Sequence, residues 1–217
     1  MSDTVLDKTN LPSYSGAEDA ANCISHAVGA AASLAALVLL IRAGASHGAS
    51  ALIGNSIFGL SLILLFSASA LYHGTRGQEK RNRLHYLDHS SIYVLIAGTY
   101  TPYCLTVLKG PLGYGILAVI WALAAGGIVL KLLFLGKHRG LSTAAYVLMG
   151  WIIAFAFGYL KKAAPPLCLF YLVAGGLAYT LGSVFYAIKR VPWFHFVFHI
   201  FVIAGAACHV ISVLNIY

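Results

Sequence analysis

The chain has 217 residues, of which 60% are hydrophobic and only 9% are charged. A soluble domain carries about 25% charged residues, so this composition excludes a soluble globular enzyme, a disordered chain and a secreted disulfide scaffold. The net charge of +8 fits cytoplasmic loops and anionic lipid headgroups better than nucleic acid. We therefore expect a multi-pass protein of the cell membrane with no nucleic-acid partner.

Apolar runs long enough to cross a membrane recur along the chain. A transmembrane helix needs about 20 mainly apolar residues, and the runs of that kind lie near residues 22–42, 51–73, 87–108, 112–135, 141–160, 166–188 and 194–215. They are too long and too uniformly apolar to be the alternating strands of about 10 residues that form a β-barrel. We predict an all-α integral membrane protein that forms a seven-helix bundle, with a cytoplasmic tail over residues 1–21 and one membrane domain over 22–217.

The positive charges between the spans predict the orientation of the bundle, because cytoplasmic loops are enriched in Lys and Arg. With the N-terminus inside, ten cationic residues are cytoplasmic and four are external. The cytoplasmic set is Lys8, Arg76, Lys80, Arg81, Arg83, Lys131, Lys137, Arg139, Lys189 and Arg190. The external set is Arg42, Lys109, Lys161 and Lys162. The count predicts a cytoplasmic N-terminus and an external C-terminus, although Lys161 and Lys162 oppose it.

Ionisable residues inside the spans are the first candidates for function, because burying one in a bilayer costs at least about 2.5 kcal/mol. Five of the six acidic residues fall in the predicted tail or in the loop after the second span, which leaves Asp88 as the lone acid of the helices. His73 ends the second span, Asp88 begins the third, and His195 and His199 begin the seventh. In the predicted orientation, all four lie in the cytoplasmic leaflet.

The spacing of these residues predicts a shared site. His195 and His199 are four residues apart and share one helix face, so both imidazoles can bind one ion. Ser69 precedes His73 at the same spacing. Three neutral histidines with an open position form a catalytic zinc site, in which Asp88 would hold water and accept its proton, and Ser69 would hydrogen-bond that water or the substrate. The same residues also permit a haem site or a proton or ion path.

Other histidines have simpler interpretations. His26 begins the first span, where an interfacial hydrogen bond is the simpler role. His85 and His89 flank Asp88 and are four residues apart. They form an alternative pair, but no third ligand on another helix selects them over His73.

Three stretches, taken in order, resemble the signature of the hemolysin III family, which belongs to the wider progestin and adipoQ receptor superfamily. They are Ser69–His73, Leu87–Pro102 and His195–His199. The resemblance covers nearly all of the chain from Asn22 onward. It implies a seven-helix fold with a cytoplasmic N-terminus and a zinc ion near the cytoplasmic side. The implied zinc ligands are His73, His195 and His199.

The resemblance also implies functions. Asp88 falls where the family has a water-contacting aspartate, and Ser69 falls where it has a serine. The adiponectin receptors of the superfamily resemble zinc-dependent amidases that cleave ceramide, so a hydrolase acting on an amide or ester of a membrane lipid is implied, with lipid or fatty acid in the helix bundle. The family name implies a second function, lysis by pore formation. A third interpretation is a non-enzymatic, zinc-stabilised regulator or sensor of membrane lipids.

Overall fold

The structure, a computed structural model, describes residues 14–133 and 139–217, and this part of the chain is helical without strands. Lys8 and Lys137 of the charge count, and most of the predicted tail, lie outside the described residues. The elements are α1 (Gly16–Ala45), α2 (Ala49–Gly74), α3 (Gln78–Thr106), α4 (Gly110–Leu133), α5 (Arg139–Trp151), η2 (Ile152–Ala156), α6 (Phe157–Ala163), α7 (Pro166–Ala187) and α8 (Phe194–Leu214). The predicted all-α multi-pass fold is confirmed.

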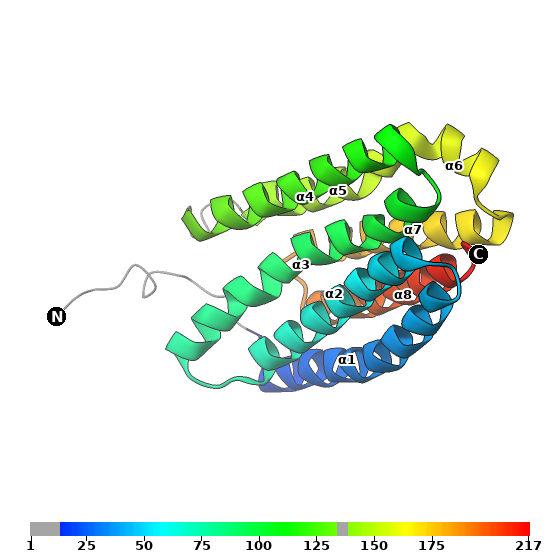
Figure 1. Ribbon diagram of the computed structural model, residues 1–217. Coiled ribbons are helices and arrows are strands. Elements are labelled where there is room, and N and C mark those ends of the chain that lie inside the picture. The colour runs from blue at the N-terminus through cyan, green and yellow to red at the C-terminus, as the bar shows by residue number, and fades with distance from the viewer. Residues whose placement is uncertain (1–13, 134–138) are drawn as a thin grey trace.

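The helices form a ring in chain order. Each of α1 to α4 contacts the next helix, α5 contacts α7, α7 contacts α8, and α8 closes the ring against α1. Figure 1 shows α1 and α2 at the lower edge of the bundle, α4 and α5 at the upper edge, and α3 between them. Because the ring closes, residues at the start of α1 meet residues at the start of α8, far away in the sequence.

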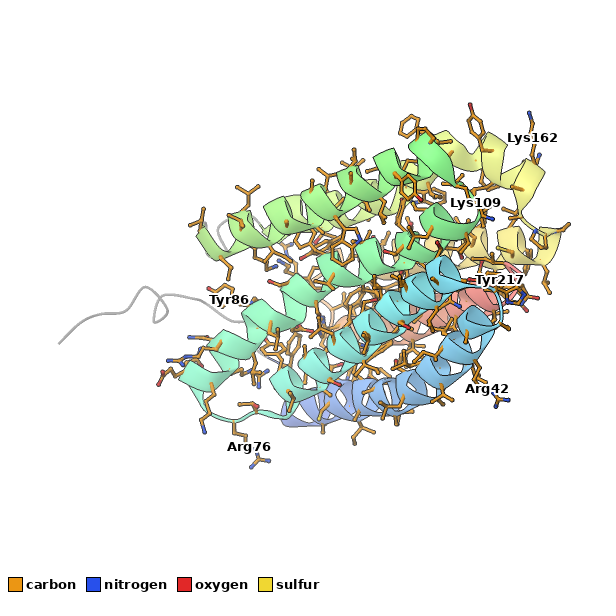
Figure 2. All side chains as sticks on the ribbon, viewed as in Figure 1. Arg42, Arg76, Tyr86, Lys109, Lys162 and Tyr217 are labelled. Carbon is orange, nitrogen blue, oxygen red and sulfur yellow. The ribbon has the colours of Figure 1, made fainter. Side chains whose placement is uncertain are left out.

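The basic residues of the predicted external set share one end of the bundle. Figure 2 shows Arg42, Lys109 and Lys162 at the end where Tyr217 lies, whereas Arg76 lies at the opposite end. This arrangement follows from the alternating direction of successive helices. It gives the two ends of the bundle the separate sets of charges on which the predicted orientation depends.

Helix α3 differs most from its prediction. The expected span near residues 87–108 begins earlier, at Gln78, so Glu79 lies in the helix and not in a loop. Glu79 and Arg83 form an ion pair of 2.7 Å one turn apart, which supports this first turn. Among the described residues, six other spans are long and apolar enough by themselves to cross a membrane. The polar α3 is accommodated because α2, α4, α5 and α8 surround it.

The fifth span, Ser142–Ala163, is broken into three pieces, which belong to α5, η2 and α6. A 3₁₀ segment interrupts the hydrogen-bond ladder and leaves backbone groups in need of partners. Tyr100 of α3 supplies them. Its hydroxyl lies 2.8 Å from the carbonyl oxygens of both Met149 and Gly150, and it accepts a hydrogen bond of 2.9 Å from the backbone N–H of Ile153. The break is therefore anchored to the centre of the bundle.

The close approach of α2 and α3 depends on Gly54. A Cβ atom built at Gly54 would lie 2.9 Å from the Cα of Pro102, a backbone atom that has little freedom to move. The helices can therefore pack at this distance only because Gly54 has no side chain. This contact holds α2 and α3 together and so helps to place Ser69 and Asp88 on the same interior.

We expect the substitution Gly54→Ala to destabilise the protein by about 1–3 kcal/mol, the usual cost of overpacking a core. Gly126→Ala is the matched control, because a Cβ atom at Gly126 meets no atom within 4 Å. Both changes gain the same intrinsic helix propensity, so their difference isolates packing. Thermal unfolding in detergent micelles measures this difference in stability. Equal melting temperatures for the two variants would contradict the packing argument.

Candidate metal centre

Three histidines from two helices converge at one end of the bundle. His73 lies in the last turn of α2, and His195 and His199 lie in the first two turns of α8. One ring nitrogen from each lies within 4.8 Å of the other two. The Nε2 atom of His195 is 3.2 Å from Nε2 of His73 and 3.2 Å from Nε2 of His199. We call these three residues the histidine cluster. The sequence-based prediction named this set, and the structure brings it together.

The geometry of the histidine cluster fits a zinc ion. Zinc binds histidine nitrogens at about 2.0–2.1 Å, and a tetrahedral arrangement at that length separates two ligand nitrogens by about 3.3 Å. The two separations of 3.2 Å agree with this value. Each neutral imidazole offers one lone pair, and converging lone pairs repel unless a cation or a proton lies between them. The cluster could therefore hold a metal ion.

A contact between the first and last helices places the α8 histidines. Trp193, just before α8, has a left-handed backbone with φ of 67°, the only positive φ at a non-glycine residue in the described part of the chain. Its backbone N–H donates a hydrogen bond of 3.1 Å to Oε1 of Glu18 in α1. A left-handed conformation costs about 1–2 kcal/mol, which this contact helps to offset. It also holds His195 and His199 against α1.

A cavity of about 500 Å³ adjoins the histidine cluster. His195 and His199 line one part of it, together with Ser69 of α2 and Asp88 of α3. Most of the remaining lining is apolar or aromatic and comes from α3, α5, α7 and α8. His209, which lies ten residues beyond His199 along α8, also lines the cavity. The cavity therefore combines polar residues of the cluster with a mostly apolar lining.

Asp88 is buried, with 8% of its surface exposed. Its Oδ2 atom lies 3.3 Å from Nδ1 of His89, and Nε2 of His89 lies 3.0 Å from the hydroxyl of Tyr186 on α7. His89 therefore contacts Asp88 and α7 and does not belong to the histidine cluster. Ser69 is also buried, with 2% exposed. Both predicted catalytic residues face the same cavity as His195 and His199, and their chemical roles remain predictions.

The prediction that Asp88 is the lone acid of the helices is wrong, because Glu18 and Asp19 lie in α1 and Glu79 lies in α3. Helix α1 begins at Gly16, capped by the Ser15 hydroxyl, which accepts a hydrogen bond of 3.1 Å from the N–H of Glu18. This early start brings Asp19 into the bundle, where its Oδ1 atom lies 2.9 Å from Nδ1 of His73. Arg81 of α3 contacts the same carboxylate at 2.7 and 2.8 Å.

The sequence does carry a signal for this inward face of α1. The residues that α1 buries are Glu18, Asn22, His26, Gly29, Ser33, Leu40 and Gly44. Most of them are polar or small and recur every three or four residues, as one face of a helix does. The sequence-based prediction treated the segment as uniformly apolar. It missed that α1 has a polar face toward the interior and an apolar face toward lipid.

Two aromatic contacts enclose the histidine cluster. The ring of His26 stacks on His199 with centroids 3.6 Å apart, so His26 is part of the interior and not an interfacial residue as predicted. The ring of Tyr14, just before α1, stacks on His195 with centroids 4.7 Å apart. Burial raises the pKa of the Tyr14 phenol well above its usual range, so the hydroxyl keeps its proton. These rings restrict the approach of water to the cluster.

These features define a multi-pass membrane protein with a histidine cluster, buried at His73 and His199 and half-buried at His195, that could bind a metal. The family model described as Haemolysin-III related matches residues 14–210. Hemolysin-3 of Bacillus cereus is 40% identical over 198 residues, covering 91% of this chain and 90% of that relative. The Hemolysin-3 homolog of Bacillus subtilis (strain 168) is also 40% identical, with 93% of its length covered. The human Monocyte to macrophage differentiation factor is 31% identical, covering 88% of this chain and 81% of the relative. The chain belongs to the Haemolysin-III related family.

Proposed function

We propose that the protein is a zinc-dependent hydrolase that cleaves an amide or ester bond of a plasma-membrane lipid. The observation that carries this proposal is the position of the histidine cluster at a cavity of about 500 Å³ that is otherwise mostly apolar. A polar centre beside an apolar cavity suits a substrate with a polar bond at one end and an acyl chain behind it.

In such a reaction, different residues of the chain have different roles. The histidine cluster would hold the zinc ion, which would supply Lewis acidity to polarise a carbonyl group and to lower the pKa of water. Asp88 accepts the proton of the attacking water and returns it to the leaving amine or alcohol. Ser69 donates a hydrogen bond to the carbonyl oxygen or orients the water. The apolar part of the cavity holds the acyl chain and excludes bulk water.

Release of fatty acid from defined lipids tests the proposal. The purified protein is reconstituted into vesicles that contain a panel of N-acyl and O-acyl lipids, and free fatty acid is measured with and without a zinc chelator. We expect release from at least one lipid class and loss of that release with the chelator. Zinc binding without turnover on any lipid would refute the hydrolase and would instead support a zinc-stabilised regulator or sensor.

The names of two relatives, Hemolysin-3 and Hemolysin-3 homolog, suggest membrane lysis as a second candidate function. The cavity lies inside a ring of helices whose outer surface is apolar over long stretches. Such a surface suits a protein that stays within one bilayer. In the same vesicles, a trapped dye reports leakage. We expect the dye to be retained, and rapid leakage on adding protein from outside would favour the lytic function.

We place the N-terminus and the histidine cluster on the cytoplasmic side, following the positive-inside rule. Arg76 and Lys109 are exposed at opposite ends of the bundle, as Figure 2 shows. In intact cells, a membrane-impermeant maleimide should label Lys109→Cys but should label Arg76→Cys only after permeabilisation. The wild type measures background from the native cysteines. The reverse labelling pattern would overturn the orientation.

A further inference from the structure

The two ring nitrogens of His73 face different partners. Nε2 lies 3.2 Å from Nε2 of His195, inside the histidine cluster. Nδ1 lies 2.9 Å from Oδ1 of Asp19 on α1. An ionised carboxylate only accepts hydrogen bonds, so Nδ1 carries the proton and the lone pair of His73 is on Nε2. The His73 side chain is fully buried, with 0% exposed, so bulk water does not reach it to replace this partner.

Asp19 is itself held in place from a third helix. Nη2 of Arg81 lies 2.8 Å from Oδ1 and 2.7 Å from Oδ2 of Asp19. The guanidinium carbon of Arg81 lies 5.0 Å from the centre of the Tyr72 ring, next to His73 on α2. Only 17% of each of the Asp19 and Arg81 side chains is exposed. Charge-assisted hydrogen bonds of this length, shielded from water, restrict the carboxylate to one position.

We propose that Asp19 is a positioning residue of the metal centre. It accepts the Nδ1 proton of His73 and thereby directs the Nε2 lone pair toward the ion, and Arg81 holds Asp19 in the orientation that this requires. Outer carboxylates of this kind select the tautomer of a ligating histidine and raise its basicity. The inference rests on zinc binding as stated in the proposed function, but it does not require turnover.

Asp88, which is buried, and Asp19, which is half-buried, therefore act differently. Asp88 lines the cavity, where a substrate can reach it, whereas Asp19 is not among the residues that line the cavity. Asp19 and Arg81 form an ion pair and together carry no net charge. Asp19 thus acts on the metal through the geometry of its hydrogen bond to His73 and not by adding negative charge to the cavity.

Zinc affinity of the full-length protein in detergent micelles tests this proposal. Affinity is measured by competition with a chelating dye for wild type, Asp19→Asn and Glu79→Gln. We expect Asp19→Asn to bind zinc about 10- to 100-fold more weakly, the usual cost of losing such a partner. Glu79→Gln removes a carboxylate from an exposed ion pair and should leave the affinity unchanged. Asp19→Asn with wild-type affinity would overturn the proposal.

Cobalt substitution separates positioning from a general structural role. At saturating Co²⁺, we expect the visible absorption bands of Asp19→Asn to differ from wild type, and those of Glu79→Gln to match it. Asp19→Glu retains a carboxylate and should recover most of the zinc affinity. If Asp19→Asn does not fold, Arg81→Gln replaces it in the test. Arg81→Gln should weaken zinc binding, and a zinc affinity of Arg81→Gln equal to that of wild type would overturn the proposal. A wild type that binds no zinc would instead refute the proposed function itself.

Discussion

Replacing His199 with alanine should remove the metal from the protein. His199 is 1% exposed, and its Nε2 atom lies 3.2 Å from that of His195. Its loss leaves two histidine ligands, too few for a stable tetrahedral site with one open position. We expect wild type purified in detergent to carry about one zinc ion per chain and His199→Ala to carry essentially none, as measured by elemental analysis.

His209→Ala is the matched control for this experiment. His209 lies on the same helix, is similarly buried at 6% exposure and lines the same cavity, but it is outside the histidine cluster. We expect this variant to keep its zinc. A ligand that binds only the folded state stabilises it by about 4 kcal/mol at a concentration a thousand times its Kd. A chelator should therefore lower the melting temperature of wild type and His209→Ala, but not that of His199→Ala. If His199→Ala contained as much zinc as wild type, the assignment of the histidine cluster as the metal site would be refuted.

Replacing Asp88 with asparagine should abolish hydrolysis while leaving the metal bound. Asp88 lines the cavity beside His195 and His199 but is not part of the histidine cluster. Asparagine has nearly the same shape and cannot take up a proton. General base catalysis contributes about 10²- to 10⁴-fold to rate, so fatty-acid release should fall by that factor. Zinc content measured on the same sample shows that the centre is intact.

Glu79→Gln serves as the comparison for Asp88→Asn. Both residues lie on α3 and both changes convert a carboxylate to an amide, but Glu79 is exposed and paired with Arg83. We expect the activity of Glu79→Gln to equal that of wild type. Equal fatty-acid release from Asp88→Asn and wild type would exclude Asp88 as the general base. Loss of zinc from Asp88→Asn would instead assign Asp88 to metal binding.

The fold was predictable from sequence where the signal was local. Apolar runs of span length follow from the cost of burying unpaired backbone groups in lipid, so the rough positions of the membrane spans could be predicted directly. The start of α3 at Gln78 was missed because its first turns are charged and lie outside the apolar run. The break at η2 was missed because it depends on Tyr100, which lies on another helix.

The candidate site was likewise predictable from the sequence only in part. The histidine cluster was found because ionisable residues in apolar spans are costly and conspicuous, and because His195 and His199 share a helix face. Asp19 was assigned to a polar tail, since nothing in its immediate neighbours marks it as buried. Its role is visible only through contacts with His73 and Arg81, which belong to two other helices.

The sequence by itself determined that this protein is a helical membrane bundle and which histidines could share a metal. These properties follow from hydropathy and from spacing along single helices, which are local. The tertiary structure decided which acid supports His73, which rings enclose the cluster and where the cavity lies. These depend on the closure of the helix ring between α8 and α1. Side-chain packing between distant segments sets that closure, and no single stretch of sequence encodes it.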